Sequence, residues 1–477
     1  SANLDESAIS GLLRLSHIPA PFSVFEGVEK IKPGYYATIT KEDDGWNISH
    51  HEYWSSAAVG RNAARNPFRG TLTEATELLS AKLSKVVKRQ MLSDVPIGAF
   101  LSGGVDSSLI AASMQENSSR AIRTFTIGFN DPSFDESPRA KQVAEFLGTE
   151  HTEHRFSSNE AMHLVPSLAS HYDEPFADAS QLPTLLLSRI TREHVTVALS
   201  GDGGDELFGG YNRHLWATSR ANRILSQSEL LRRTLANLAK LPTDSSWERL
   251  AALLRATGSG AAIPSELGRK VAKVAEGLQA GSPFEAYIAA RLTGWKLPRV
   301  NPALLSQAQG VWIEDDSLLN NMRLADTNSY LPDSVLTKVD RAAMSVGLET
   351  RIPFLDHEVF EFAWTLPSSF LINQNQGKRI LREAFAKKLP REMLARAKSG
   401  FTVPLGAWLR SGLRDWTEAM LDENALRTIP QIDAEAVRST WRQHLAGTTD
   451  RSYDLWPVLM LRSWLLNREA SAPLRKW

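Results

Sequence analysis

The chain has 477 residues, enough for two or three domains or for one large domain with appended segments. Lysine plus arginine and aspartate plus glutamate both number 54, so the formal net charge is zero and neither nucleic acid nor an anionic membrane is an expected partner. Cysteine is absent, which excludes disulfide bonds, a cysteine nucleophile and thiolate metal sites within this sequence.

Residues 1–70 predict a short helix, a proline-rich turn and a pair of strands. Apolar residues recur at helical spacing over residues 9–13, and Pro19 ends the pattern. After a Lys-Pro-Gly turn, residues 35–40 alternate as a strand does. Residues 57–69 show little apolar periodicity and are predicted to be a linker.

Residues 71–215 predict alternating strands and helices. An amphipathic helix is expected over residues 72–91, where apolar residues repeat every three or four positions. Three later apolar runs resemble buried parallel strands, namely residues 97–101, 122–129 and 195–199. This pattern predicts an α/β fold with a doubly wound, mostly parallel sheet that binds ligands at the carboxyl ends of its strands. Strand signals then nearly vanish, and residues 216–477 are predicted to be a mainly helical remainder.

The first chemically informative loop follows the strand that ends at Leu101. Gly103 and Gly104 allow the backbone to turn its N–H groups inward around phosphate oxygens, and a helix that opens near Ser107 adds positive potential. Phosphate repels an acid in such a loop unless a cation lies between them, so Asp106 is a candidate Mg²⁺ ligand. The alternative is an ordinary strand–helix turn whose serine and aspartate only cap the helix.

A second loop of the same kind follows the run that ends at residue 199. Its sequence, SGDGGDELFGGY (200–211), has three carboxylates within five residues, an arrangement that is costly after a core strand unless a cation or solvent meets them. Asp106 and Asp205 are therefore expected to clamp a magnesium triphosphate between adjacent strand ends.

The segment SGGVDSS (102–108) resembles the pyrophosphate loop of the N-type ATP pyrophosphatases, and together with the second loop it resembles the asparagine synthetase B family. Five further segments agree with that family in order and content: FTIGF (125–129), DEPFADASQLPT (173–184), LTKVDRAAMSVGLETRIPFLD (336–356), GKRILREAF (377–385) and LWPVLMLRSWL (455–465). The resemblance spans about residues 72–467. It implies an enzyme that adenylates a carboxylate, releases pyrophosphate and lets ammonia attack the acyl-AMP.

The resemblance also implies roles for single residues. Nucleotide binding is expected from Leu101, Ser102, Gly103, Gly104, Asp106, Ser107, Ile127, Ser200 and Gly201, and metal binding from Asp106 and Asp205. Lys378 matches a lysine that neutralises charge building on the α-phosphate and the leaving pyrophosphate.

Three further residues are catalytic candidates. Asp202 stands where well-studied members carry a glutamate thought to take a proton from the attacking nitrogen, and whether the shorter side chain reaches is left open. Tyr211 and Glu349 lie in matching segments, but a buried structural ion pair with Arg351 is the alternative for Glu349.

Full-length members of the family begin with a glutaminase domain whose nucleophile is an N-terminal cysteine. Residues 1–70 resemble the end of that domain plus a linker, and the sequence begins with Ser1. Two expectations follow: the glutaminase half is removed or lies outside this numbering, or the protein works without its own glutaminase. The possible partners are a glutaminase domain or subunit and a second copy of the chain in a homodimer. The nitrogen source is either glutamine or free ammonia.

The leading hypothesis is a carbon–nitrogen ligase that uses ATP and Mg²⁺, with aspartate as the default carboxylate and ammonia as its nucleophile. Sugar acids of surface polysaccharides, or precursors of β-lactam or lasso-peptide rings, are alternative substrates. A tRNA-modifying ATP pyrophosphatase is disfavoured by the neutral charge and absent cysteine, and a non-catalytic scaffold by the presence of Asp106, Asp205 and Lys378. No apolar run approaches the roughly 20 residues of a membrane helix and no secretory signal is visible, so a cytoplasmic location is expected.

Overall fold

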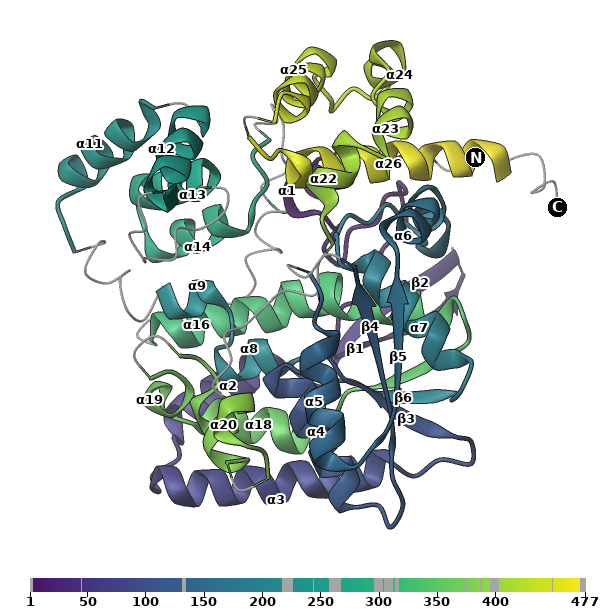
Figure 1. Cartoon of the computed structure of the whole chain (residues 1–477), viewed down its shortest axis with the longest axis vertical. Helices are drawn as coiled ribbons and strands as arrows, with labels where there is room; N and C mark the ends of the chain where they lie inside the picture. The colour runs from purple at the N-terminus through teal and green to yellow at the C-terminus, as the bar shows by residue number, and fades with distance from the viewer. Residues whose placement is uncertain are drawn as a thin grey trace.

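The computed structural model describes residues 3–43, 45–130, 134–216, 226–242, 244–256, 267–295, 303, 312–313, 317–373, 376–386, 388–394, 403–447 and 449–471. Five strands form the central sheet in the order β5-β4-β3-β6-β7, and all neighbours are parallel (Figure 1). Their bounds are Ile97–Phe100 (β3), Arg123–Phe129 (β4), Glu150–Phe156 (β5), Val197–Leu199 (β6) and Glu349–Arg351 (β7). The predicted α/β fold with a mostly parallel sheet is confirmed.

Helices make up most of the remaining described chain. Up to residue 216 they are α1 (Glu6–Leu15), α2 (Ser56–Arg65), α3 (Leu72–Gln90), α4 (Val105–Glu116), α5 (Ser137–Leu147), α6 (Ser158–Leu164), η1 (Val165–His171), α7 (Gln181–Arg192), α8 (Gly204–Phe208) and α9 (Asn212–Trp216). Beyond it they are α11 (Glu229–Lys240), α12 (Asp244–Ala256), α13 (Leu267–Gln279), α14 (Pro283–Arg291), α16 (Leu318–Ala325), η3 (Asp326–Leu336), α17 (Thr337–Met344), η4 (Pro353–Leu355), α18 (His357–Thr365), α19 (Ser368–Leu371), α20 (Arg379–Ala384), α21 (Arg391–Leu394), α22 (Leu405–Arg410), α23 (Arg414–Met420), α24 (Glu423–Arg427), α25 (Ala434–Leu445) and α26 (Ser452–Ser471).

The chain builds the sheet outward from β3 in two directions. Strands β4 and β5 are added on one side of β3, and β6 and β7 on the other. Connections that leave β3 and β6 therefore diverge, and in open parallel sheets the crevice at such a switch point is where ligands bind. The loops that follow these two strands are the two glycine-rich loops of the sequence.

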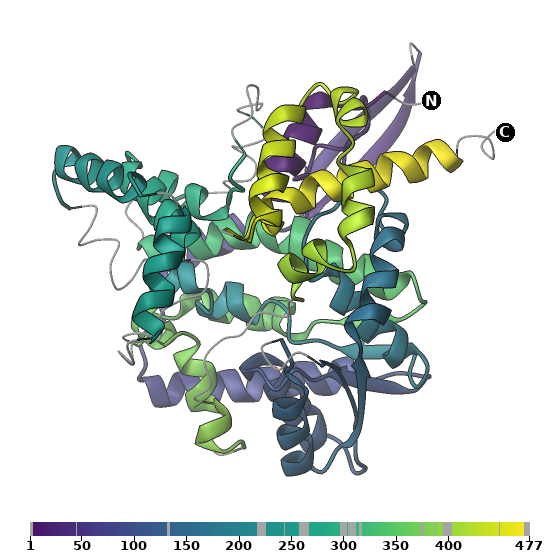
Figure 2. The same ribbon diagram turned by 45° about the horizontal axis from the view of Figure 1, so that its top comes forward.

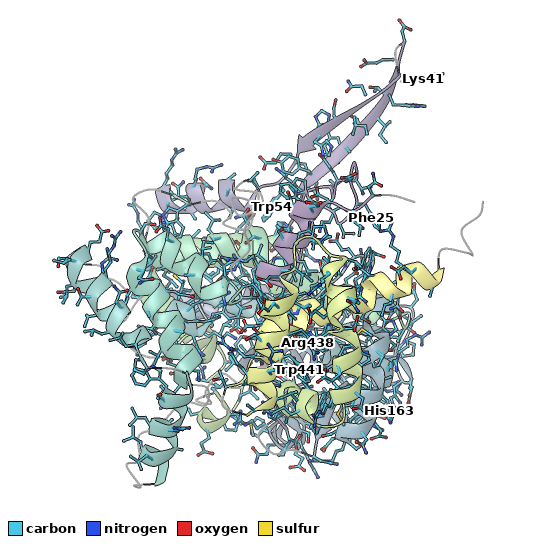
Figure 3. The ribbon with its side chains drawn as sticks, turned by 90° about the horizontal axis from the view of Figure 1, so that it is seen from above. Phe25, Lys41, Trp54, His163, Arg438 and Trp441 are labelled. Carbon is cyan, nitrogen blue, oxygen red and sulfur yellow. The ribbon has the colours of Figure 1, made fainter. Side chains whose placement is uncertain are left out.

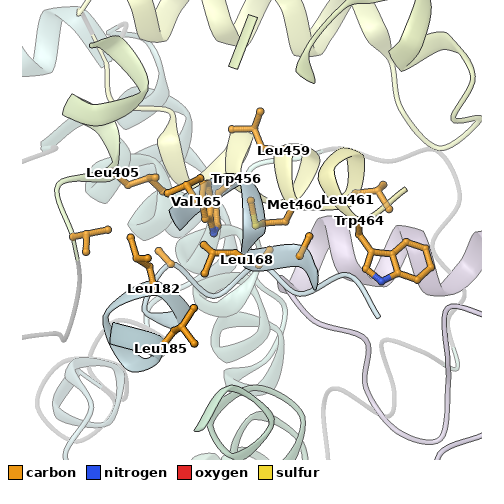
Figure 4. Packing of buried hydrophobic residues seen from close by; sticks show 14 of the residues in the cluster. Val165, Leu168, Leu182, Leu185, Leu405, Trp456, Leu459, Met460, Leu461 and Trp464 are labelled. Atoms are coloured by element: carbon orange, nitrogen blue, oxygen red, sulfur yellow. The ribbon is translucent and has the colours of Figure 1, made fainter. Parts of the chain in front are cut away.

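Apolar side chains along β3 point alternately to the two faces of the sheet, which explains why helices cover both faces. Ala99 and Leu101 belong to the apolar cluster that includes α3, α4 and α18, whereas Phe100 belongs to the cluster of α7 and α26. Successive side chains of a strand point to opposite faces, so each face needs its own helical layer. On the second face, Trp456, Leu459 and other residues of α26 pack with Val165 and Leu168 of η1 (Figure 4).

Two strands of the sheet, β5 and β7, are not among the predicted runs. The sequence of β5 is EHTEHRF, and most of its side chains are at least partly exposed because the strand lies at an edge. Strand β7 has three residues, also at an edge, within a mainly helical region. Both edge strands carry mostly polar residues, so they lack the apolar run that identified the three inner strands.

Helix α2 lies where weak apolar periodicity predicts a linker. Its buried residues are serine, alanine and glycine, which supply burial without the large apolar side chains that make a helical repeat visible. The Ser55 side chain caps the helix by accepting the N–H of Ala58 at 3.3 Å.

The predicted strand pair near the N-terminus is confirmed as the antiparallel hairpin of β1 (Tyr35–Glu42) and β2 (Gly45–Glu52). The hairpin projects from the body of the protein, with Lys41 near its tip (Figure 3). Tyr36, Ile39, Trp46 and Ile48 on it are exposed.

Helices α11 to α14 form a bundle to one side of the sheet, and α1, α22, α23 and α25 gather around α26 (Figures 1 and 2). No helix in the described ranges is both long enough and apolar enough to cross a membrane.

Candidate active site

A cavity of about 820 Å³ opens at the carboxyl ends of β3 and β6. Its lining includes all but two of the predicted site residues: Leu101, Ser102, Gly103, Gly104, Asp106, Ser107, Ser200, Gly201, Asp202, Asp205, Tyr211 and Lys378. Residues from three separate stretches of chain (101–107, 200–211 and Lys378) therefore meet at the switch point of the sheet.

The loop after β3 is shaped as a nest in front of helix α4. Gly103 has a φ of +70°, and a Cβ there would lie 2.6 Å from the backbone nitrogen of Ala140, so only glycine suits the position. The Ser102 N–H donates to Ser107 Oγ at 3.1 Å, and the Gly104 N–H donates to Ser102 Oγ at 3.2 Å. Backbone N–H groups and the α4 N-terminus at this loop suit an anion such as phosphate.

The loop after β6 packs directly against the first loop. A Cβ on Gly201 would lie 2.7 Å from the Ser107 backbone nitrogen, and one on Gly204 would lie 2.7 Å from Cγ of Asp106. Both distances are shorter than real Cβ contacts allow, so glycine at these two positions is what lets the loops touch.

Lys378 lies between the two carboxylates that were predicted to bind metal. Its ammonium group donates to Asp106 and lies 2.6 Å from Asp205 Oδ1, and its side chain is only 8% exposed. Burial by itself lowers the pKa of Lys378, but Asp106 and Asp205 more than offset this and hold the pKa above its ordinary value. Lys378 is therefore charged at neutral pH.

Backbone contacts around Lys378 explain how the segment before α20 comes to lie beside the two glycine-rich loops. Lys378 has a φ of +58°, and its N–H donates to the carbonyl of Phe208 at 3.1 Å. A Cβ on Gly377 would lie 2.3 Å from the carbonyl oxygen of Gly209. The segment before α20 is thus held against the end of α8 by backbone contact.

The same two carboxylates fit a magnesium ion. Oxygens of Asp106 and Asp205 converge on one cationic atom, so they are close enough together to share one cation. Mg²⁺ typically takes one or two carboxylates together with substrate phosphate oxygens, and the phosphate nest adjoins this pair. The donor set present is therefore the one that the predicted Mg²⁺ site needs.

A second charged group lines the cavity, and the sequence prediction missed it. Lys338 Nζ donates to Ser180 Oγ at 2.9 Å and lies 3.5 Å from Asp178 Oδ2. Burial lowers the pKa of Lys338, but Asp178 and Asp202 outweigh it and raise the pKa above its ordinary value. These residues stand within two segments that match the family, LTKVDRAAM and DEPFADASQLPT, and that placement was the available signal.

Asp202 and Tyr211 both face the cavity with defined partners. The Ser200 hydroxyl donates to Asp202 Oδ2 at 2.5 Å, and the Tyr211 hydroxyl donates to Glu206 Oε1 at 2.5 Å. Burial, and then the charge of Glu206, raise the pKa of Tyr211 well above its ordinary value, so the phenol keeps its proton.

Two predicted site residues lie outside the cavity. Ile127 is buried in the core of the α7 face, and its neighbour Thr126 lines the cavity instead. Glu349 is 54% exposed and pairs with Arg351 at 2.6 Å. It lies opposite Val197, at the amino end of β6, whereas the cavity is at the carboxyl end. The alternative of a buried structural ion pair is right about the partner, Arg351, but wrong about burial, because the Glu349 side chain is exposed.

Comparison with known proteins shows to which family the chain belongs. The sequence profile described as asparagine synthase matches residues 78–466. Asparagine synthetase [glutamine-hydrolyzing] 1 of Bacillus subtilis is 29% identical over 466 residues, which cover 97% of this chain and 68% of that protein. Asparagine synthetase [glutamine-hydrolyzing] 3 of the same organism is 25% identical, covering 92% and 67%. The asparagine synthetase of Cricetulus griseus is 24% identical, covering 98% and 70%. This chain belongs to the asparagine synthase family of ATP-dependent carbon–nitrogen ligases.

Proposed function

We propose that this chain adenylates a substrate carboxylate with ATP and transfers ammonia to the acyl-AMP, releasing AMP and pyrophosphate. The single observation that carries the proposal is the meeting of a phosphate nest, two carboxylates and a buried lysine at the switch point of the sheet. Each of the three suits one part of a reaction in which an oxygen nucleophile attacks a phosphate.

In this proposal the nest of residues 102–107 binds the pyrophosphate part of ATP, and Asp106 and Asp205 hold Mg²⁺. The ion, when bound, neutralises charge on the phosphate oxygens. Lys378 adds a fixed positive charge beside the leaving pyrophosphate, where negative charge grows as the bond to the α-phosphorus breaks.

Other residues of the cavity lining are proposed to act on the carboxylate and the nitrogen. Lys338, held by Ser180 and Asp178, orients the attacking carboxylate oxygen. Asp202 is the proposed acceptor of the proton that ammonia sheds as it attacks the acyl-AMP, because its carboxylate already faces the cavity. Tyr211 remains protonated and supplies shape and a hydrogen bond to Glu206.

The proposed carboxylate is aspartate, because the relatives are described as asparagine synthetases. A sugar acid is the second candidate that the experiment includes. The relatives' printed names also include glutamine hydrolysis, so a glutaminase domain or subunit is the proposed source of ammonia.

The test measures pyrophosphate release from ATP with Mg²⁺ and ammonium, across aspartate, uronic acids and other carboxylates. Release that depends on one carboxylate supports the proposal and names the substrate class. Asp106→Ala is expected to abolish the release, whereas Asp340→Ala, at an exposed carboxylate, is the matched control. Full activity in Asp106→Ala would contradict the proposed role of the two carboxylates.

A further inference from the structure

Asp326 is a fully buried carboxylate that does not line the cavity of the candidate active site, and side chains of α9 and α14 bind it. Arg213 donates to Asp326 Oδ2 from Nε at 3.1 Å, and its Nη2 lies 2.8 Å from the same oxygen. His214 Nε2 also lies 2.8 Å from that oxygen, and the Tyr287 hydroxyl donates to Oδ1 at 2.6 Å. Burial raises the pKa of Asp326, but the charge of Arg213 more than offsets this and holds the pKa below its ordinary value, so the carboxylate is ionised at neutral pH.

Arg213 joins this carboxylate to the wall of the cavity. Its guanidinium group lies over the ring of Tyr211, 3.7 Å from the ring centre, and 5.2 Å from the centre of the Tyr330 ring. Both tyrosines line the cavity, and their rings meet edge to face with centres 5.9 Å apart. A cation this close to an aromatic face attracts it, and Asp326 fixes where the cation lies. The position of the two rings therefore depends on Asp326.

The two rings adjoin the part of the cavity that is proposed to act on the carboxylate. The Tyr211 hydroxyl donates to Glu206 Oε1 at 2.5 Å. Burial, and then the charge of Asp178, raise the pKa of Tyr330 to about 12, and Lys338 is close enough to act on the same phenol. Lys338 and Asp178 are the pair proposed to orient the attacking carboxylate. A displaced ring would therefore disturb the carboxylate before it disturbed the nucleotide.

Asp326 also holds the start of a second element that lines the cavity. It is the first residue of η3, a π-helix that continues without a break into α17. Tyr330 of η3 and Lys338 of α17 both line the cavity. Arg213, by contrast, lies in α9, shortly after the second glycine-rich loop. One carboxylate thus joins two separate stretches of the cavity lining, and π-helical segments of this kind are frequent at functional sites.

A purely structural role is the alternative for this network. A buried ion pair often adds little stability, because the cost of removing two charges from water offsets their attraction. A fully bonded polar network does, however, define one arrangement of the groups that it joins. The arrangement defined here is that of side chains in the cavity wall, which favours a role in positioning.

We propose that Asp326 is a positioning residue: it holds Arg213 in place, and the two tyrosine rings beside Arg213 keep the carboxylate-binding part of the cavity in its working arrangement. The expected effect on turnover rests on the proposed function, whereas the placement of the rings does not. The bundle of α11 to α14 is thereby connected to the site, since Tyr287 of α14 holds the same carboxylate.

The kinetic test measures KM for the carboxylate and for ATP in variants of the network. Asp326→Asn keeps the size of the side chain and removes the charge that holds Arg213. KM for the carboxylate is expected to rise at least about tenfold, the effect of one hydrogen bond to a charged group, while KM for ATP stays within about twofold. Arg213→Lys, which keeps the charge but loses the flat group over Tyr211, is expected to show the same difference. Tyr287→Phe removes one hydrogen bond to Asp326 and is expected to give a smaller rise.

The control for a loss of stability alone is Leu459→Ala, in the core around α26 and outside the cavity lining. It is expected to lower the thermal midpoint and to leave both KM values unchanged. Equal rises in both KM values in Asp326→Asn, or no rise in either, would overturn the inference. If Asp326→Asn does not fold, Arg213→Lys and Tyr287→Phe decide by the same criterion.

A spectroscopic test separates this inference from the proposed reaction. In protein labelled with fluorotyrosine, the fluorine NMR signal of Tyr211 is identified by its loss in Tyr211→Phe. Asp326→Asn is expected to shift that signal because the cation over the ring moves, and Leu459→Ala is expected to leave it in place. An unmoved Tyr211 signal in Asp326→Asn overturns the inference. A shifted signal without pyrophosphate release on any acid keeps the positioning role and contradicts the proposed reaction instead.

Discussion

The ammonium nitrogen of Lys378 lies 2.6 Å from the carboxylate of Asp205, and it also donates to Asp106, which is 272 residues away in the chain. One side chain therefore joins both glycine-rich loops to the segment before α20. Two carboxylates that lie this close together repel each other, and the lysine offsets that repulsion. The electrostatic arrangement of the site is thus built into the folded protein.

Removing that lysine should affect stability and catalysis in separable ways. Lys378→Met leaves Asp106 and Asp205 facing each other, so unfolding free energy without Mg²⁺ should fall by roughly 3–5 kcal/mol, the usual cost of breaking a buried ion pair. Adding Mg²⁺ should restore much of it, while pyrophosphate release stays at least about 100-fold below wild type. Chemical denaturation with and without Mg²⁺ measures the first effect. A variant that is equally stable in both conditions would argue against a shared cation.

Gly210 tests how closely the site must be packed. A Cβ there would lie 2.0 Å from Asp205 Oδ1 and 2.1 Å from Lys378 Cε, so Gly210→Ala should push this ion pair apart. A displacement near 1 Å can cost about 100-fold in rate, so turnover should drop by that order. The control is Gly277→Ala in helix α13, where no atom lies within 4 Å and helix propensity should raise stability by about 1 kcal/mol. Wild-type turnover in Gly210→Ala would show that the site tolerates the displaced pair.

Asp333 should make stability depend on pH. Its carboxyl group is buried and accepts the N–H of Ala20 at 3.2 Å, and burial raises its pKa to about 7. The unfolded chain has a lower carboxyl pKa, near 4, so the folded state binds the extra proton between these values. This contribution to stability is complete below about pH 4 and is lost as pH rises towards 7.

The matched variant is Asp333→Asn, which keeps the acceptor for Ala20 but cannot ionise. Its unfolding free energy should change less between pH 4 and pH 7 than that of wild type. At pH 8 it should exceed the wild-type value by a few kcal/mol. Denaturant titrations at a series of pH values give the comparison. Parallel pH profiles for the two proteins would mean that Asp333 ionises normally.

Lys338 should influence the carboxylate more than the nucleotide. Lys338→Met removes the donor to Ser180 and the charge beside Asp178, so kcat/KM for the carboxylate should fall by roughly 10- to 100-fold. KM for ATP should stay within about twofold. Lys388→Met, at a lysine that pairs with Glu116 outside the cavity, is the matched control for loss of a lysine. An increase in KM for ATP alone would mean that Lys338 binds the nucleotide and not the carboxylate substrate.

The sequence predicts the inner strands and both glycine-rich loops because their signals are local. Strands β3, β4 and β6 carry continuous apolar runs, and each loop combines glycines with acids directly after such a run. The exposed edge strand β5 and the small-residue helix α2 lack those signals. Lys338 and Asp178 lie in segments that resemble the family, but their position beside the two glycine-rich loops depends on packing between distant parts of the chain.

By itself, the sequence determined the fold class, the family resemblance and the chemistry of the two loops, since these depend on residue types at short spacing. Only the tertiary structure decided which distant side chains join them. Parallel pairing places Glu349 opposite Val197, at the end of the sheet away from the cavity, whereas backbone contact with Phe208 holds Lys378 inside it. Strand register and packing between distant segments fix these positions, and no local pattern encodes them.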